Sequence, residues 1–260
     1  EDMLKLLKRN IVKRFISWKT IVLMIVGLGT MFTCYQHVPG RDGIHFSYLI
    51  LEGPFAVFYQ VVSPQNSILI ASVLLAIMIL YFMESPIINQ DDRFFIIRTG
   101  KKPWIITEMI GILCSSVIWI LLINIMGCIS SYNHMDWADY HIYTSNMKCM
   151  LIYLLAYTCI GLLILLFHLL NIKALGTAMM VTLFLLENFI LDVLPNNISV
   201  FSDSADSGKI LSVIKKFTFM NRMENGYMGD SFLTSILYFG IIIVVLVQLN
   251  LTYAGKHEIG

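Results

Sequence analysis

The sequence has few charged residues for its length. Only 13% of its 260 residues are Asp, Glu, Lys or Arg, and 57% are hydrophobic, whereas about 25% of a typical soluble domain is charged. The formal net charge is +1, which excludes a strong attraction of the whole chain to nucleic acid. This composition indicates that lipid, rather than water, surrounds most of the chain.

Several motifs of enzymes and metal sites are missing. None of the Gly-Lys pairs has the earlier glycine and the following hydroxyl of a Walker A loop, so ATP hydrolysis would have to occur on another chain. No HExxH motif is present, and the five cysteines show no CxxC spacing, so we expect them to pack as free thiols. A loose group of His134, Asp136, Asp139 and His141 has irregular spacing and is interpreted as a solvated loop. We therefore assign no catalytic residue, metal or cofactor to this chain.

The sequence instead contains six apolar stretches, each long enough to cross a bilayer. A hydrocarbon core about 30 Å thick needs roughly 20 helical residues, because every backbone polar group must be satisfied within the segment. The predicted spans are residues 18–35, 66–83, 104–129, 149–170, 174–193 and 232–253. We predict an all-α polytopic membrane protein whose residues 1–260 form a single transmembrane domain.

The positions of the basic residues predict the orientation in the membrane. Twelve of the 18 Lys and Arg lie on the side of the termini. They are Lys5, Lys8, Arg9, Lys13, Arg14, Lys19, Arg93, Arg98, Lys101, Lys102, Lys173 and Lys256. Under the positive-inside rule, this bias places both termini in the cytoplasm. An even number of spans agrees with that orientation.

The segment 1–17 has the pattern of an amphipathic helix. Leu4, Leu7, Ile11 and Phe15 recur at helical spacing, and lysine and arginine occupy the other faces. We interpret this segment as an interfacial helix on the cytoplasmic leaflet. The alternative is a straight extension of the first span with a basic flank.

The predicted cytoplasmic connection 84–103 combines an exposed apolar run with basic residues. Apolar side chains would be a liability in water, so we expect this segment to dock on a cytoplasmic partner. The alternative is a lipid-facing anchor at the interface. The residues of this candidate coupling element are Arg93, Phe94, Phe95, Ile96, Ile97, Arg98, Lys101 and Lys102.

Two other connections differ greatly in length. The link formed by residues 171–173 is so short that the fourth and fifth spans must be an antiparallel hairpin. The long connection 194–231 is expected to form an external cap with a short helix.

A few polar residues fall inside the predicted spans and are candidates for a transport pathway. Glu187 is the clearest, with Asn188 beside it, because a charged group in hydrocarbon is costly. A helix-packing role is an equally good interpretation of Glu187. Asn124, Gln248 and Asn250 fit hydrogen bonds between helices. Glu108 lies near a cytoplasmic helix end, where snorkelling to the headgroups would explain it.

This arrangement resembles the membrane subunit of ABC type-2 exporters, a family of permeases that dimerise and bind separate ATPase subunits. The resemblance covers nearly the whole chain and rests on architecture. It implies a bacterial cytoplasmic membrane protein whose partners are an ABC ATPase, which carries ATP and Mg²⁺, and a second copy of itself or a paralogous permease. The stretch from Arg93 to Trp104 looks like that of small permeases that export peptides or confer resistance to them, including bacteriocins and phenol-soluble modulins.

Two other classes of function remain open on the sequence. One is an ATP-independent membrane-embedded enzyme or immunity protein that uses Glu187 or the group from His134 to His141. The other is the substrate-capture subunit of a vitamin importer, which also has about six spans.

Overall fold

The regular structure of the described residues is entirely helical. The computed structural model describes residues 2–15, 18, 21–22, 25, 96–97, 100–131, 140–188, 218–219, 222–223 and 231–256. The named helices are α1 (Asp2–Phe15), α7 (Lys101–Ser131), α8 (Tyr140–Leu169), α9 (Lys173–Asn188) and α14 (Ser231–Lys256). No strand occurs within these ranges. The predicted all-α class is therefore confirmed for this part of the chain.

Three of the described helices are long and apolar enough to cross a membrane. The candidate spans are Lys101–Ile125 in α7, Tyr143–Leu169 in α8 and Ser231–Ala254 in α14. Over its described length, α9 has 16 residues, slightly fewer than a bilayer core needs. The predicted spans 18–35 and 66–83 lie outside the described residues, apart from four helical positions between 18 and 25. The chain is a membrane protein, and the count of six spans stays a prediction.

The helix boundaries differ most from the prediction at the start of α8. This helix begins at Tyr140, whereas the sequence predicts a span beginning at residue 149. The additional residues are mostly polar. The prediction missed them because hydropathy marks the edge of the hydrocarbon and not the end of the helix. A helix can continue beyond the bilayer wherever its backbone bonds and packing are favourable.

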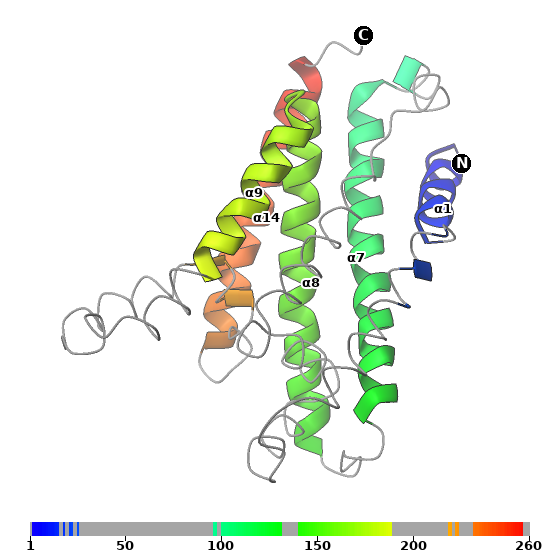
Figure 1. The fold of residues 1–260 in the computed structure, drawn as a ribbon. Coiled ribbons are helices and arrows are strands. Elements are labelled where there is room, and N and C mark those ends of the chain that lie inside the picture. Colours follow the sequence, from blue (N-terminus) through cyan, green and yellow to red (C-terminus); the bar gives the residue numbers. More distant parts are fainter. Residues whose placement is uncertain are drawn as a thin grey trace, which may run out of the picture.

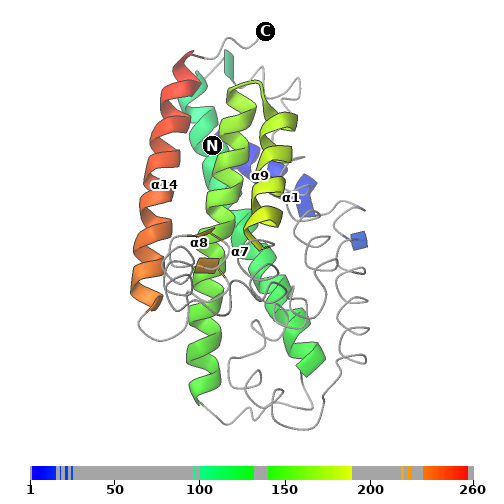
Figure 2. The ribbon, with the colours of Figure 1, turned by 60° about the vertical axis from the view of Figure 1, so that its left-hand side comes forward.

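The helix α8 lies at the centre of the described bundle. It packs against α7, α9 and α14; α7 and α9 run antiparallel to it and α14 runs parallel to it (Figure 1, Figure 2). Of its apolar window, 67% is buried, against 17% for α14. A helix that is apolar on all sides is expected in such a central position.

The start of α7, the α8–α9 turn and the end of α14 lie at one end of the bundle (Figure 1). Lys101, Lys102, Lys173 and Lys256 belong to these elements. We call this the lysine end. The other end holds the last residues of α7 and the first residues of α8 and α14.

Two glycines allow neighbouring helices to pack closely on α8. A Cβ at Gly161 would collide with Cγ2 of Ile112 in α7. A Cβ at Gly176 in α9 would lie 2.5 Å from the ring of Phe167 in α8. Small residues of this kind bring helix backbones together in membranes, where dispersion contacts replace the hydrophobic drive available in water. The close packing of α7 on α8 and of α9 on α8 therefore requires glycine, which has no side chain, at these two positions.

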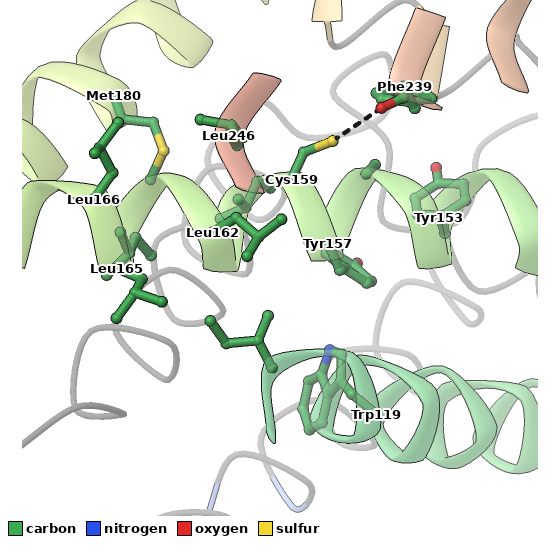
Figure 3. Packing of buried hydrophobic residues seen from close by; sticks show 14 of the residues in the cluster. Trp119, Tyr153, Tyr157, Cys159, Leu162, Leu165, Leu166, Met180, Phe239 and Leu246 are labelled. Carbon is green, nitrogen blue, oxygen red and sulfur yellow. Dashed lines mark hydrogen bonds between the residues drawn. The ribbon is translucent and has the colours of Figure 1, made fainter. Parts of the chain in front are cut away.

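Polar contacts between α8 and α14 supplement their apolar packing. The thiol of Cys159 donates to the carbonyl oxygen of Phe239 at 3.7 Å (Figure 3). The Asn250 amide nitrogen donates to the carbonyls of Leu162 at 3.0 Å and Leu246 at 2.8 Å. Because the Leu162 bond links two helices, the predicted interhelical role of Asn250 is confirmed.

Many hydroxyl groups in the helices bond to their own backbone. The hydroxyls of Thr107, Ser115, Thr158, Thr177, Thr182 and Thr252 each donate to the carbonyl four residues earlier. A hydroxyl satisfied in this way can face lipid or a packed core at little cost. These six groups therefore do not line a polar route through the bundle.

The α8–α9 turn is as tight as predicted. Asn171 has a φ of 59° and its backbone N–H bonds to the carbonyl of His168, while the Ile172 N–H bonds to that of Phe167. These two bonds form a Schellman motif, in which the left-handed position is usually Gly and sometimes Asn. The chain reverses within three residues, so α8 and α9 form the predicted antiparallel hairpin.

Candidate coupling surface at the lysine end

Gly100 separates the helical residues Ile96 and Ile97 from α7, and we call this break the elbow. Ile96 and Ile97 are helical, and the Gly100 N–H donates to the Ile96 carbonyl at 2.8 Å. Gly100 has a φ of 89°, a conformation that ends a helix at least cost when the residue is glycine. The next helix begins immediately at Lys101. The elbow therefore joins the candidate coupling segment directly to a membrane-spanning helix.

The two described isoleucines of the coupling segment differ in burial. Ile96 is buried with the hydrophobic core, whereas Ile97 is 79% exposed. Lys102 is exposed and Lys101 is half-buried. The segment is thus anchored by one isoleucine and presents the other next to basic side chains. Arg93, Phe94, Phe95 and Arg98 lie outside the described residues.

The start of α7 is firmly held in the bundle. Pro103 lies in its first turn, where its missing N–H has no helical partner to lose. Trp104 and Ile105 follow, with exposed fractions of 3% and 0%. A movement of the elbow would therefore be carried into the 31 residues of α7.

The helix α1 packs across the same part of α7. In Figure 2 it runs transverse to the long helices, and Leu7 lies against Gly111, 3.7 Å from the position of a Cβ there. Leu6 is buried, whereas Leu4 is 73% exposed. Ile11 is half-buried, and the side chain of Phe15 lies outside the described set. Leu6 is therefore more buried than Leu4, Leu7 and Ile11, although the helical spacing of apolar residues did not select it.

Of the candidate pathway residues, only Asn124 has a described side chain. The Asn146 amide nitrogen of α8 donates to Oδ1 of Asn124 in α7 at 2.9 Å. The predicted interhelical hydrogen bond of Asn124 is therefore confirmed, with a partner that hydropathy placed outside the spans. Glu187 and Asn188 are the last residues of α9, and their side chains lie outside the described set.

Glu108 has a different position from the one expected. It is 4% exposed, so the interpretation as a residue reaching the headgroups is wrong. Gly111, three residues later, contacts α1, and Ile112, four residues later, contacts α8. Both positions share a helix face with Glu108. Glu108 therefore lies inside the bundle, where α1 and α8 meet α7.

At the other end, the residues before α14 dock on its first turns. The Arg222 guanidinium donates to the hydroxyls of Thr234 at 2.9 Å and Ser235 at 3.2 Å. Phe219 packs edge-to-face on Phe239 with ring centroids 5.2 Å apart. The described part of the predicted cap is therefore attached to α14. Most of the segment 194–231 lies outside the described residues.

The described ranges contain no cluster of three His, Cys, Asp or Glu side chains that could hold a metal ion. Of the loose group from His134 to His141, only His141 falls within them. Cys114, Cys128, Cys149 and Cys159 are free thiols, in agreement with the expectation from their spacing.

Comparisons with known proteins found no relative. No family model matches the chain, and neither the curated proteins nor the solved structures include a match.

Proposed function

We propose that this chain is the membrane subunit of an ATP-driven exporter in a bacterial cytoplasmic membrane. It has six spans with both termini in the cytoplasm, and it works as a dimer with separate ATPase subunits. Its cargo is a peptide, a drug or another amphipathic molecule, as the resemblance to ABC type-2 permeases implies. The chain itself has no catalytic role.

The observation that carries this proposal is the elbow at Gly100. An ATPase that changes shape must push on something rigid, and the elbow ends in a long helix whose first residues are buried. The exposed Ile97 and the neighbouring Lys102 offer apolar and basic contacts to a partner. The transverse helix α1 packs on the same turns of α7 and would move with them.

The charge distribution supports a cytoplasmic position for the elbow. The lysine end has the elbow lysines, Lys173 and Lys256, whereas Lys148 and Arg222 are the described basic residues near the other end. An excess of lysine at membrane-proximal positions favours the cytoplasmic side. The C-terminal end of α14 lies at that same end.

The packing of the bundle supports a pathway between two copies. The centre of the described helices is filled by large side chains, among them Tyr153, Tyr157 and Phe239, each at most 2% exposed. The nearby hydroxyls bond to their own helices. These hydroxyls therefore mark no polar route through the described helices, and we place the pathway between two subunits.

The decisive experiment tests whether an ATP-binding chain attaches at the elbow. The full chain is purified from its native membrane and photolabelled with an azido-ATP probe, before and after the change Ile97→Asp. We expect the parent to bring down a labelled partner and the variant to lose it, because an unpaired charge in an apolar interface is strongly unfavourable. The variant should stay folded, since Ile97 is 79% exposed.

Tyr140→Asp is the matched control. Tyr140 is 73% exposed at the start of α8, at the opposite end of the bundle. This variant should retain the labelled partner. Absence of a labelled partner from the parent, or equal recovery with both variants, would contradict coupling through the elbow.

A further inference from the structure

A glutamine lies on an exposed and mostly apolar side of α14. This helix forms one edge of the bundle (Figure 2). Its exposed side includes Leu237, Ile241 and Val244, which are 65%, 64% and 68% exposed. Gln248 is exposed on the same side, because positions spaced by three, four and seven residues share a helix face. The amide therefore follows three exposed apolar side chains on one face of its helix.

The depth of Gln248 keeps its amide in hydrocarbon. It lies six residues before Ala254, the end of the candidate span, or about 9 Å at 1.5 Å per residue. Side chains of a helix tilt toward its N-terminus, and the N-terminus of α14 is at the far end of the bundle. The side chain thus points toward the middle of the bilayer and away from the nearer headgroups.

An amide in hydrocarbon needs a hydrogen-bond partner. Leaving one unsatisfied there costs several kcal/mol. The Thr252 hydroxyl bonds to the backbone carbonyl of Gln248 at 2.8 Å, which satisfies the threonine but leaves the amide unchanged. Among the residues that the structure describes, no side chain or carbonyl bonds to the Gln248 amide. Its partner must come from outside this set.

We propose that α14 packs against α14 of a second copy of this chain, with the two Gln248 side chains hydrogen-bonded to each other. Two copies in one membrane have the same orientation, so a twofold axis along the membrane normal lets the residues nearest the axis face their own equivalents. A glutamine amide both donates and accepts, and therefore complements itself, which a lysine or glutamate would not do. The apolar neighbours Ile241 and Val244 provide the flanking contacts.

This inference deepens the dimeric part of the proposed function and rests on it. It assigns the subunit contact to α14, while the elbow of α7 remains the site for the ATPase. The two assignments can fail separately, because the elbow experiment detects a nucleotide-binding partner and the following experiments detect a second copy.

Cysteine cross-linking tests the contact directly. Single changes Ile241→Cys, Val244→Cys and Gln248→Cys are made in the full chain and oxidised in native membranes, with the parent and its own cysteines as baseline. We expect new disulfide-linked dimers from all three. Leu113→Cys and Leu183→Cys, which are exposed on α7 and α9, should give none. Dimers from the two controls alone, or none above baseline from α14, would overturn the proposal.

A second measurement tests the role of the amide. Dimer dissociation is followed by fluorescence energy transfer between labelled copies in vesicles, after the changes Gln248→Leu and Gln248→Asn. Loss of two interhelical hydrogen bonds should weaken the dimer roughly 5- to 30-fold in the leucine variant, with partial recovery in the asparagine variant. The control Thr252→Val should stay near the parent value, because its hydroxyl bond is internal to the helix.

Two results would refute this arrangement. An unchanged dimer in the leucine variant would mean that Gln248 does not contribute to the contact. Cross-links from residue 248 to residues 18–35 or 66–83 of the same chain would mean that a span of its own subunit covers the glutamine. Circular dichroism and monodispersity of each variant confirm that it is folded, so either result can be interpreted.

Discussion

The close packing of α7 on α8 predicts a sharp difference between two Gly→Ala substitutions. Gly161 in α8 has no room for a methyl group, because its Cβ would collide with Ile112. Gly240 in α14 has nothing within 4 Å of the same position. Both glycines lie inside helices, so alanine brings each the same gain in helix propensity, up to about 1 kcal/mol. The difference between the variants therefore isolates the collision.

Overpacking a filled interior costs about 1–3 kcal/mol. Ile112 is 3% exposed, and its branched β-carbon holds the γ-methyl in a stiff rotamer, so it cannot easily move aside. We expect Gly161→Ala to be less stable than Gly240→Ala by about 1–3 kcal/mol. Gly240→Ala itself should be neutral or slightly stabilised.

The free energies of unfolding can be measured by SDS titration in mixed micelles, followed by circular dichroism. Ile112→Leu provides a rescue test, since leucine has no methyl branch on its β-carbon and the swap alone costs less than about 1.5 kcal/mol. The double variant should recover at least half of the difference. Equal unfolding free energies for the two alanine variants, or no recovery with leucine, would refute the close contact of α7 with α8.

Two further predictions concern the turn and the interhelical amides. Asn171→Gly should stabilise the α8–α9 hairpin slightly, and Asn171→Val should destabilise it by about 1–2 kcal/mol, because the φ of 59° suits glycine and opposes a branched residue. Thermal unfolding in detergent distinguishes the two variants, and the same unfolding midpoint for both would count against the turn. Asn124→Leu and Asn146→Leu should each lower the free energy of unfolding by about 0.5–2 kcal/mol. The double variant should lose less than the sum, because one hydrogen bond joins the two residues, and strict additivity in a double-mutant cycle would exclude this bond.

The sequence predicted the spans better than their contacts. Continuous apolar runs indicated the helices found as α7, α8 and α14, since a bilayer imposes both composition and length on a spanning helix. The same reasoning missed the polar first turns of α8, which include the partner of Asn124. Hydropathy averages over a window, and it contains no information about which face of one helix meets another.

In the coupling segment too, the sequence predicted the kind of element but not its contacts. Its apolar and basic residues indicated a docking element, and Gly100 could have been recognised as a helix end because glycine is favoured in the left-handed position that closes a helix. The sequence could not distinguish Ile96 from Ile97, which are adjacent and chemically identical. The fold buries the first and exposes the second.

Local composition is enough to predict that this chain lies in a membrane and that its helices are apolar, because transfer of side chains and backbone into lipid depends on each segment alone. The sequence also predicted the tight turn at residues 171–173, since so short a link allows only an antiparallel hairpin. The central position of α8, the burial of Glu108 and the exposure of Gln248 became visible in the folded chain and not before. These features depend on contacts between segments distant in sequence, and the geometry of helix packing, rather than hydrophobicity, selects among them.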